Sequence, residues 1–206
     1  MLISDSHQFI FVHIRKLAGN SFRDVLTPLS NPIPKDLKSK IKSRMLPLEG
    51  NYQKYSLRAH SPILEIKKIM PPALFDNYFK FAFVRHPFTR LASEYEYVKS
   101  QTEHGRHNKV SKMSFQQYIT YQSQRFDAHQ INMLVDENDQ VVMDFIGKFE
   151  SIHDDWLHVC KELQISVPKL NHKNRATKVN KNDYINDENK ALVAKLWKRD
   201  IDAFGY

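Results

Sequence analysis

Cysteine is almost absent from this chain, and long apolar runs are missing altogether. The single cysteine among the 206 residues, Cys160, excludes an intramolecular disulfide and any zinc site built on several cysteines. Its setting in WLHVCKEL indicates packing on the apolar face of a helix rather than catalysis. No apolar run approaches the roughly 20 residues of a membrane-spanning helix, and no signal-peptide pattern opens the chain. These absences predict a soluble cytoplasmic protein, with the inner membrane surface as the alternative location.

Acidic residues are the minority among the charged side chains. The chain has 31 lysines and arginines against 23 acids, a formal net charge of +8. This excess favours an anionic partner: a nucleotide, an acidic glycan, a nucleic acid or an anionic membrane surface. The length and the 41% hydrophobic content are ordinary for a globular protein, so we expect one domain over residues 1–206.

Apolar, β-branched and aromatic segments predict strands separated by helical patterns. The strongest strand signal is in YFKFAFVRHP, where the expected strand ends at Arg85. The expected strands are 8–14, 55–60, 78–85 and 141–150. Residues 99–112 are polar and are expected to form a loop, and Pro71 and Pro72 are expected to close a short helix. The expected helices are 22–29, 63–70, 88–98, 114–121, 152–163 and 193–204.

The alternation of strands and helices predicts an α/β fold. We expect a mostly parallel central sheet flanked by helices on both faces. Such sheets bind ligands at the carboxyl ends of their strands, so the ends of the first and third expected strands are the places to look for a site.

The first strand runs into a short segment rich in small and basic residues. Lys16 precedes Gly19, Asn20 and Ser21 at the expected start of a helix. Unpaired backbone N–H groups and the positive end of the helix dipole favour an anion there, and glycine lets the backbone approach it closely. The lysine precedes the glycine, which differs from the GxxxxGK[ST] order of nucleoside triphosphatases. An ordinary turn capped by Ser21 is the structural alternative.

A second basic pattern, VRHPFTRLASEY, follows the third expected strand. Arg85 closes that strand, Pro87 suits the first turn of a helix, and Arg90 and Ser93 are spaced to share a helical face. A guanidinium and a hydroxyl group that converge on one point make a good phosphate site. Two anion sites at strand ends suggest a ligand that is phosphorylated in two places.

These motifs resemble those of sulfotransferases that use 3′-phosphoadenosine 5′-phosphosulfate (PAPS). FVHIRKLAGNSF is similar to their 5′-phosphosulfate loop and FVRHPFTRLASEY to their 3′-phosphate motif. The most similar subgroup comprises carbohydrate sulfotransferases of family 2, related to the chondroitin 4-O- and HNK-1 enzymes. DFIGKFESIHDDW, LNHKNRATK and the terminal LVAKLWKRDIDAFGY also resemble that subgroup. The family's usual proline and threonine beside the lysine are replaced by Arg15 and Leu17, and Asn20 stands for a frequent threonine.

The resemblance implies a P-loop-like sulfotransferase fold and a set of donor-binding residues. The 5′ side of PAPS would be held by Arg15, Lys16, Gly19, Asn20, Ser21 and Phe22, and the 3′-phosphate by Arg85, Arg90 and Ser93. The loop NHKNRATK would close over the nucleotide through Lys173, Asn174 and Arg175. The alternative for each basic residue of that loop is a solvated surface charge.

The implied reaction needs no metal and yields 3′,5′-adenosine bisphosphate. Lys16 is the candidate for neutralising the leaving oxygen, and His60 is the candidate general base, with Glu65 or Glu94 as alternatives. The acceptor would be a carbohydrate, with an anionic or lipid-linked glycan compatible with the charge, and no nucleic acid is expected. Gln130 resembles a position near the acceptor; a buried amide satisfied by backbone is the alternative. The basic residues Arg106, Lys109 and Lys112 either meet an anionic glycan or are solvated surface.

Two other functions stay open from the residues alone. A nucleotide or small-molecule kinase would need the Walker order of lysine and serine together with acidic magnesium ligands, and neither stands out. A non-catalytic binder of polyanions would spread its affinity over many basic side chains and show a steep salt dependence.

Overall fold

Aromatic residues at alternate positions mark the two inner strands of the sheet. The computed structural model describes residues 1–17, 19–31, 59–168 and 184–206. In this part of the chain the sheet has four strands in the order β1-β2-β3-β4. β1 is antiparallel to β2, whereas β2, β3 and β4 run parallel. The expectation of an α/β fold with a mostly parallel sheet is therefore confirmed. The strands are β1 Leu2–Ser4, β2 Phe9–Val12, β3 Phe79–Val84 and β4 Phe145–Lys148.

The contacts between residues divide the chain into two compact units. The first comprises Met1–Val84 with Met133–Lys173 and contains the sheet. The second comprises Arg85–Asn132 with Asn174–Tyr206 and is helical where it is described. The predicted anion-binding segment around Lys16 thus belongs to the first unit, and the one that begins at Arg85 belongs to the second.

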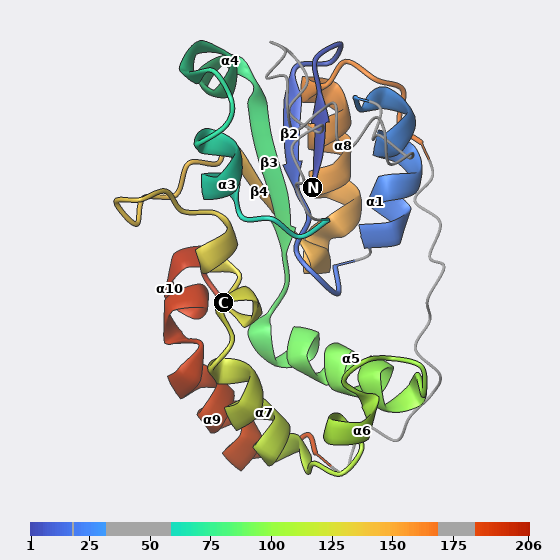
Figure 1. Cartoon of the computed structure of the whole chain (residues 1–206), viewed down its shortest axis with the longest axis vertical. Coiled ribbons are helices and arrows are strands. Elements are labelled where there is room, and N and C mark those ends of the chain that lie inside the picture. Colours follow the sequence, from blue (N-terminus) through green and yellow to red (C-terminus); the bar gives the residue numbers. More distant parts are fainter. Residues whose placement is uncertain (18, 32–58, 169–183) are drawn as a thin grey trace. The chain divides into compact units, whose positions relative to one another are not determined.

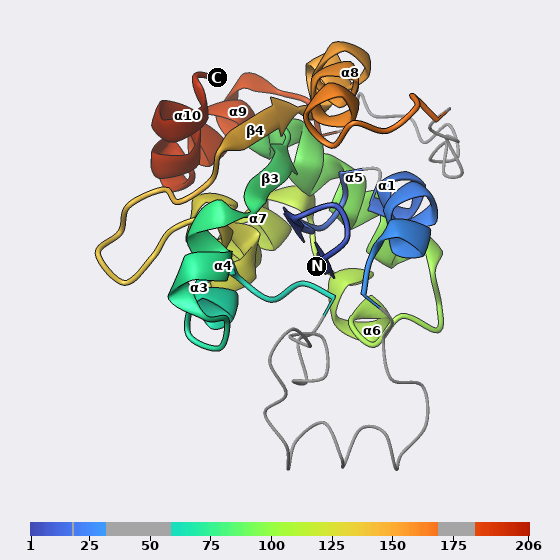
Figure 2. The same ribbon diagram turned by 90° about the horizontal axis from the view of Figure 1, so that it is seen from above.

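In the first unit, one face of the sheet is aromatic. Phe9 and Phe11 of β2 and Phe81 and Phe83 of β3 point to the same side because alternate residues of a strand share a face. Helices α1 (Gly19–Leu26) and α8 (Ile152–Glu162) cover this face. Helices α3 (Ile63–Lys67) and α4 (Pro72–Asn77) lie on the other side of the sheet (Figures 1 and 2). Cys160 is fully buried in the aromatic core, as the sequence predicts.

The second unit packs its helices around a core of its own. The stripe expected on residues 88–98 is present, and its members Phe88, Leu91 and Tyr95 are buried with Phe115, Tyr118 and Trp197. This unit contains α5 Pro87–Ser100, α6 His107–Val110, α7 Phe115–Ser123, α9 Asp187–Leu196 and α10 Lys198–Phe204. Short 3-10 turns are Thr27–Leu29 and Phe149–Ser151 in the first unit, Phe126–Ala128 in the second and Ile131–Met133 at the division.

The strand expected to end at His60 is wrong in the part that is described. Ala59 and His60 form a turn, and residues 55–58 lie outside the described residues. In the sheet as described, β2 already has β1 on one edge and β3 on the other, so no edge of β2 remains for such a strand. Ser61 and Pro62 then lead directly into α3, with Pro62 at the N-cap.

Three other boundaries differ from the sequence-based expectation. α3 already ends at Lys67, ahead of both prolines, and Pro72 begins α4, because a proline at the first helical position lacks an N–H that would have no partner. The polar segment 99–112 contains α6, which is anchored by the buried Val110. The final helix is two helices that meet at Trp197, whose buried indole donates a hydrogen bond to the Ala128 carbonyl at 2.9 Å.

Candidate active site

The segment after β2 changes direction through a residue in an unusual backbone conformation. Arg15 and Lys16 form a turn, and Lys16 has φ = 65°, in the left-handed region. For a residue with a Cβ this conformation costs about 1–2 kcal/mol relative to a right-handed one. Such outliers concentrate where a backbone is held for function. The turn delivers the chain to the first residue of α1, Gly19.

The start of α1 offers backbone donors next to this lysine. The N–H groups at the start of a helix have no partner within the helix, and in the first three helical positions of α1 they belong to residues 19–21. Ser21 is buried, at 4% exposure. Phe22 is fully buried, and its ring stacks on Phe83 with centroids 4.3 Å apart. The Phe22 side chain is therefore out of reach of a ligand, and it fixes α1 on the sheet.

Two histidines come together beside the end of β2. The His60 ring lies 4.5 Å from the His13 ring, and Nδ1 of His60 is 2.8 Å from the His13 carbonyl oxygen. A carbonyl only accepts, so Nδ1 of His60 carries the proton and its Nε2 keeps a lone pair. Burial lowers the pKa of His60 below its usual value of 6.5, although the bond to the carbonyl opposes this shift. His60 is therefore a neutral imidazole at neutral pH with one basic nitrogen left.

His13 itself is the more deeply buried of the two. Burial lowers its pKa to about 2, and the neighbouring His60 and Arg15 add to the effect. Within the described residues, Nδ1 of His13 is a buried nitrogen without a hydrogen-bond partner. The His13 side chain is thus neutral throughout the working pH range, and its carbonyl orients His60.

The segment after β3 turns directly into the longest helix of the second unit. Arg85 follows the last residue of β3, and His86 caps α5 by accepting a hydrogen bond from the Phe88 amide at 3.2 Å. Pro87 occupies the first helical position, as the sequence predicts. Nε of Arg85 donates to Oγ1 of Thr89 at 3.0 Å, so the guanidinium lies along the first turn of α5.

The other two predicted phosphate contacts on α5 differ in exposure. Ser93 is half-buried, whereas Arg90 is only 1% exposed. The Arg90 guanidinium donates to the Ala128 carbonyl and faces the Glu94 carboxylate at 3.9 Å. Arg90 thus has internal contacts that hold α5 to the chain around Ala128, and its predicted role toward a phosphate stays a prediction.

Two further sequence-based candidates are engaged within the second unit. Glu94, an alternative general base, is buried, and its Oε1 accepts from Arg106 at 2.6 Å. Gln130, expected near the acceptor or as a buried amide, is fully buried and bonds the main chain of Arg85 in both directions. The structure thus shows Gln130 as a buried amide satisfied by backbone. Asp200 completes this cluster, and no local sequence signal distinguishes it from the exposed charges around it.

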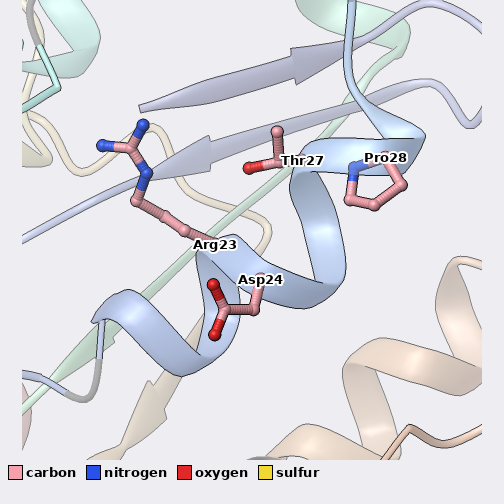
Figure 3. A pocket seen from close by; sticks show the side chains of 4 residues that line it. All are labelled: Arg23, Asp24, Thr27 and Pro28. Carbon is pink, nitrogen blue, oxygen red and sulfur yellow. The ribbon is translucent and has the colours of Figure 1, made fainter. Parts of the chain in front are cut away.

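A pocket lies on the other half of α1. Arg23, Asp24, Thr27 and Pro28 line it, and Figure 3 shows the Arg23 and Asp24 side chains pointing away from each other. These residues belong to the C-terminal half of α1 and the turn beyond it, whereas the backbone donors are at the N-terminal end. This pocket is therefore distinct from the predicted anion site.

Part of the predicted site falls outside the described residues. Lys173, Asn174 and Arg175 belong to this part, as does the side chain of Asn20. Within the described ranges, no group of three or more His, Cys, Asp or Glu side chains could hold a metal ion. None of the helices described there combines the length and apolar character needed to cross a membrane.

These features define an α/β protein with two neighbouring parallel strands, each followed by a basic residue and then by a helix. The basic residues are Lys16 between β2 and α1 and Arg85 between β3 and α5. The model of the Sulfotransferase family matches residues 1–206, and the chain belongs to this family. It is accordingly an enzyme of sulfonate transfer. An uncharacterised protein of Archaeoglobus fulgidus is 30% identical over 104 residues, which cover 50% of this chain and 81% of that protein. No solved structure matches the chain.

Proposed function

We propose that this protein transfers the sulfonate group of PAPS to a hydroxyl group of a carbohydrate. The observation that carries the proposal is the pairing of β2 with β3. Val12 is opposite Ala82 in a parallel register, so both strands end at the same edge of the sheet. One continues through Lys16 into α1 and the other through Arg85 into α5. A donor with anionic groups at both ends of its ribose matches two basic strand ends.

In this proposal the segments after β2 and β3 bind different anionic groups of the donor. The backbone N–H groups at the start of α1, with Lys16, Arg15 and Ser21, bind the 5′-phosphosulfate. Arg85 and Ser93 bind the 3′-phosphate, because a guanidinium fork and a hydroxyl donor suit a phosphate dianion. Lys173, Asn174 and Arg175 are proposed to contact the nucleotide as well.

The chemical step requires charge neutralisation and removal of one proton. The acceptor oxygen forms a bond to sulfur while the bond from sulfur to the bridging oxygen breaks, and the electron pair stays on the 5′-phosphate. Lys16 stabilises the charge on that oxygen. Nε2 of His60 takes the hydroxyl proton, since Nδ1 is already occupied by the His13 carbonyl. The products are a sulfate ester and 3′,5′-adenosine bisphosphate, and no metal takes part in this scheme.

The acceptor is proposed from the family resemblance and the net charge. The motifs resemble those of carbohydrate sulfotransferases, and a net charge of +8 suits an acidic or lipid-linked glycan. A cytoplasmic enzyme, or one working at the inner membrane surface, would meet such a glycan. Of the three basic residues considered for this contact, Arg106 is half-buried and pairs with the buried Glu94, whereas Lys109 and Lys112 are exposed.

Thermal unfolding with three nucleotides tests the donor. At equal concentrations we expect 3′,5′-adenosine bisphosphate to stabilise the protein more than AMP or ATP. At a hundred times its dissociation constant the bisphosphate should raise the free energy of unfolding by about 2.7 kcal/mol over the protein without ligand. Arg85→Ala should remove this preference, whereas Arg199→Ala should retain it, because Arg199 is an exposed arginine of α10. A kinase would prefer ATP. A polyanion binder would respond equally to both substitutions and lose affinity steeply with salt.

A further inference from the structure

The fully buried carboxylate of Asp200, on α10, binds the backbone at Gln130 and Ile131. Oδ2 of Asp200 accepts a hydrogen bond from the Gln130 amide N–H at 2.8 Å, and Oδ1 accepts from the Ile131 amide at 3.1 Å. The side-chain Nε2 of Gln130 is also 3.4 Å from Oδ2. Asp200 and Gln130 are both 0% exposed. This carboxylate therefore fixes both the backbone and the amide side chain of Gln130.

The Gln130 side chain in turn holds the main chain of Arg85. Its Oε1 accepts from the Arg85 N–H at 3.0 Å, and its Nε2 donates to the Arg85 carbonyl at 2.8 Å. These are the two bonds that a neighbouring strand would make with a residue in a sheet. The side-chain amide thus takes the place of a strand at the first residue after β3, where the ladder with β4 ends at Val84.

We infer that Gln130 and Asp200 are positioning residues for the 3′-phosphate site. The Arg85 guanidinium is hydrogen-bonded to Thr89, and the Arg85 main chain is held by Gln130. Arg85 therefore loses little conformational entropy when its guanidinium binds a phosphate. Gln130 and Asp200 act through Arg85 and need not touch the ligand. This inference rests on the proposed function, since it assigns Arg85 to the 3′-phosphate.

The chain offers a matched control for this inference. Gln122 on α7 is also a buried glutamine of the second unit, at 1% exposure, and its Nε2 donates to the Tyr118 hydroxyl at 2.6 Å. Methionine has a similar shape to glutamine and makes neither amide hydrogen bond. Gln130→Met removes two buried bonds to the Arg85 main chain and Gln122→Met removes one buried bond to Tyr118, so both lose buried hydrogen bonding but only the first frees Arg85.

Calorimetric titration with 3′,5′-adenosine bisphosphate and with AMP gives the readout. The ratio of the two dissociation constants isolates the contribution of the 3′-phosphate. We expect Gln130→Met to reduce this ratio about three- to tenfold, the cost of ordering one long side chain, with AMP affinity unchanged. Gln122→Met should leave the ratio unchanged. Asp200→Asn keeps the shape of the side chain and should shift this ratio in the same direction. This second variant tests the inference if Gln130→Met does not fold.

The outcomes separate the inference from the proposed function. Equal affinities of the unaltered protein for both nucleotides would overturn the proposed function, and the inference with it. A clear preference in the unaltered protein that survives both Gln130→Met and Asp200→Asn would overturn the inference alone. Equal losses in Gln130→Met and Gln122→Met would do the same, because they would show a general effect of buried bonds.

Discussion

Lys16 combines a strained backbone with the charge that the proposed reaction needs. Its φ of 65° is a conformation that glycine adopts without a steric penalty. A sequence selected only for stability would favour glycine at this position. The lysine is thus explained by its side chain, which is the part that the proposed reaction uses.

This trade-off can be measured with Lys16→Gly. Loss of the strain should raise the free energy of unfolding by up to about 1 kcal/mol, the balance of the left-handed penalty and the greater entropy of unfolded glycine. Sulfonate transfer should fall far more than donor affinity, because the charge on the leaving oxygen develops in the transition state. Chemical denaturation and steady-state kinetics provide the two values.

Gln164 provides the control for that substitution. It also has a left-handed backbone, with φ = 52°, and it is an exposed residue just beyond α8. Gln164→Gly should therefore raise stability in the same way and leave transfer unchanged. The explanation of Lys16 fails if Lys16→Gly keeps full turnover.

Single residues also show what sequence reasoning can reach. Gly19 and Ser21 are at the start of a helix after a buried strand, as their spacing predicts, because such signals are local. The roles of Gln130 and Asp200 could not be predicted, since the residues that they bond are 45 and 70 positions away in the chain. The spacing of Arg90 predicts a phosphate contact, whereas its bond to the Ala128 carbonyl, 38 positions away, has no signal in the sequence.

The scale of elements shows the same division. The strong strand signals at 8–14 and 78–85 gave β2 and β3 because continuous apolar runs suit buried parallel strands. β1 cannot be predicted from the sequence, because three residues carry too little pattern. The junction of α9 and α10 has no signal in the sequence, because neither glycine nor proline marks it. The two helices meet at Trp197, which is packed in the core of the second unit.

The paired histidines connect two elements, the end of β2 and the turn before α3, and make stability depend on pH. Burial lowers the pKa of His13 from 6.5 to about 2, so the native state binds fewer protons than the unfolded state between these values. The free energy of unfolding therefore falls as the pH drops below about 6.5. From pH 7.5 to 5.5 His13 should account for a loss of about 1 kcal/mol.

Denaturant titrations at the two pH values test this dependence. His13→Gln cannot be protonated in this range, so its stability should change less between pH 7.5 and 5.5 than that of the unaltered protein. His153→Gln, on the exposed side of α8, should keep the original dependence. Identical pH dependences of His13→Gln and the unaltered protein would show that His13 is not the buried neutral group described here.

At the scale of the whole molecule, charge and topology point to the same chemistry. A parallel sheet places the ends of β2 and β3 at one edge, and the chain's excess of cations favours an anionic substrate. Membership of the Sulfotransferase family supplies the reaction type. The fold class could be predicted because it follows from periodicity along the chain, whereas the acceptor could not, because glycan recognition depends on side chains brought together from distant segments.

The most direct measurement is the transfer of isotopically labelled sulfonate from PAPS to a panel of glycans, with 3′,5′-adenosine bisphosphate quantified in parallel. We predict a labelled sulfate ester and one equivalent of the bisphosphate per turnover, with both products lost in Lys16→Ala. Release of the bisphosphate without a labelled glycan would contradict a carbohydrate acceptor. No turnover of PAPS with any acceptor, by a protein that is folded, would contradict the account as a whole.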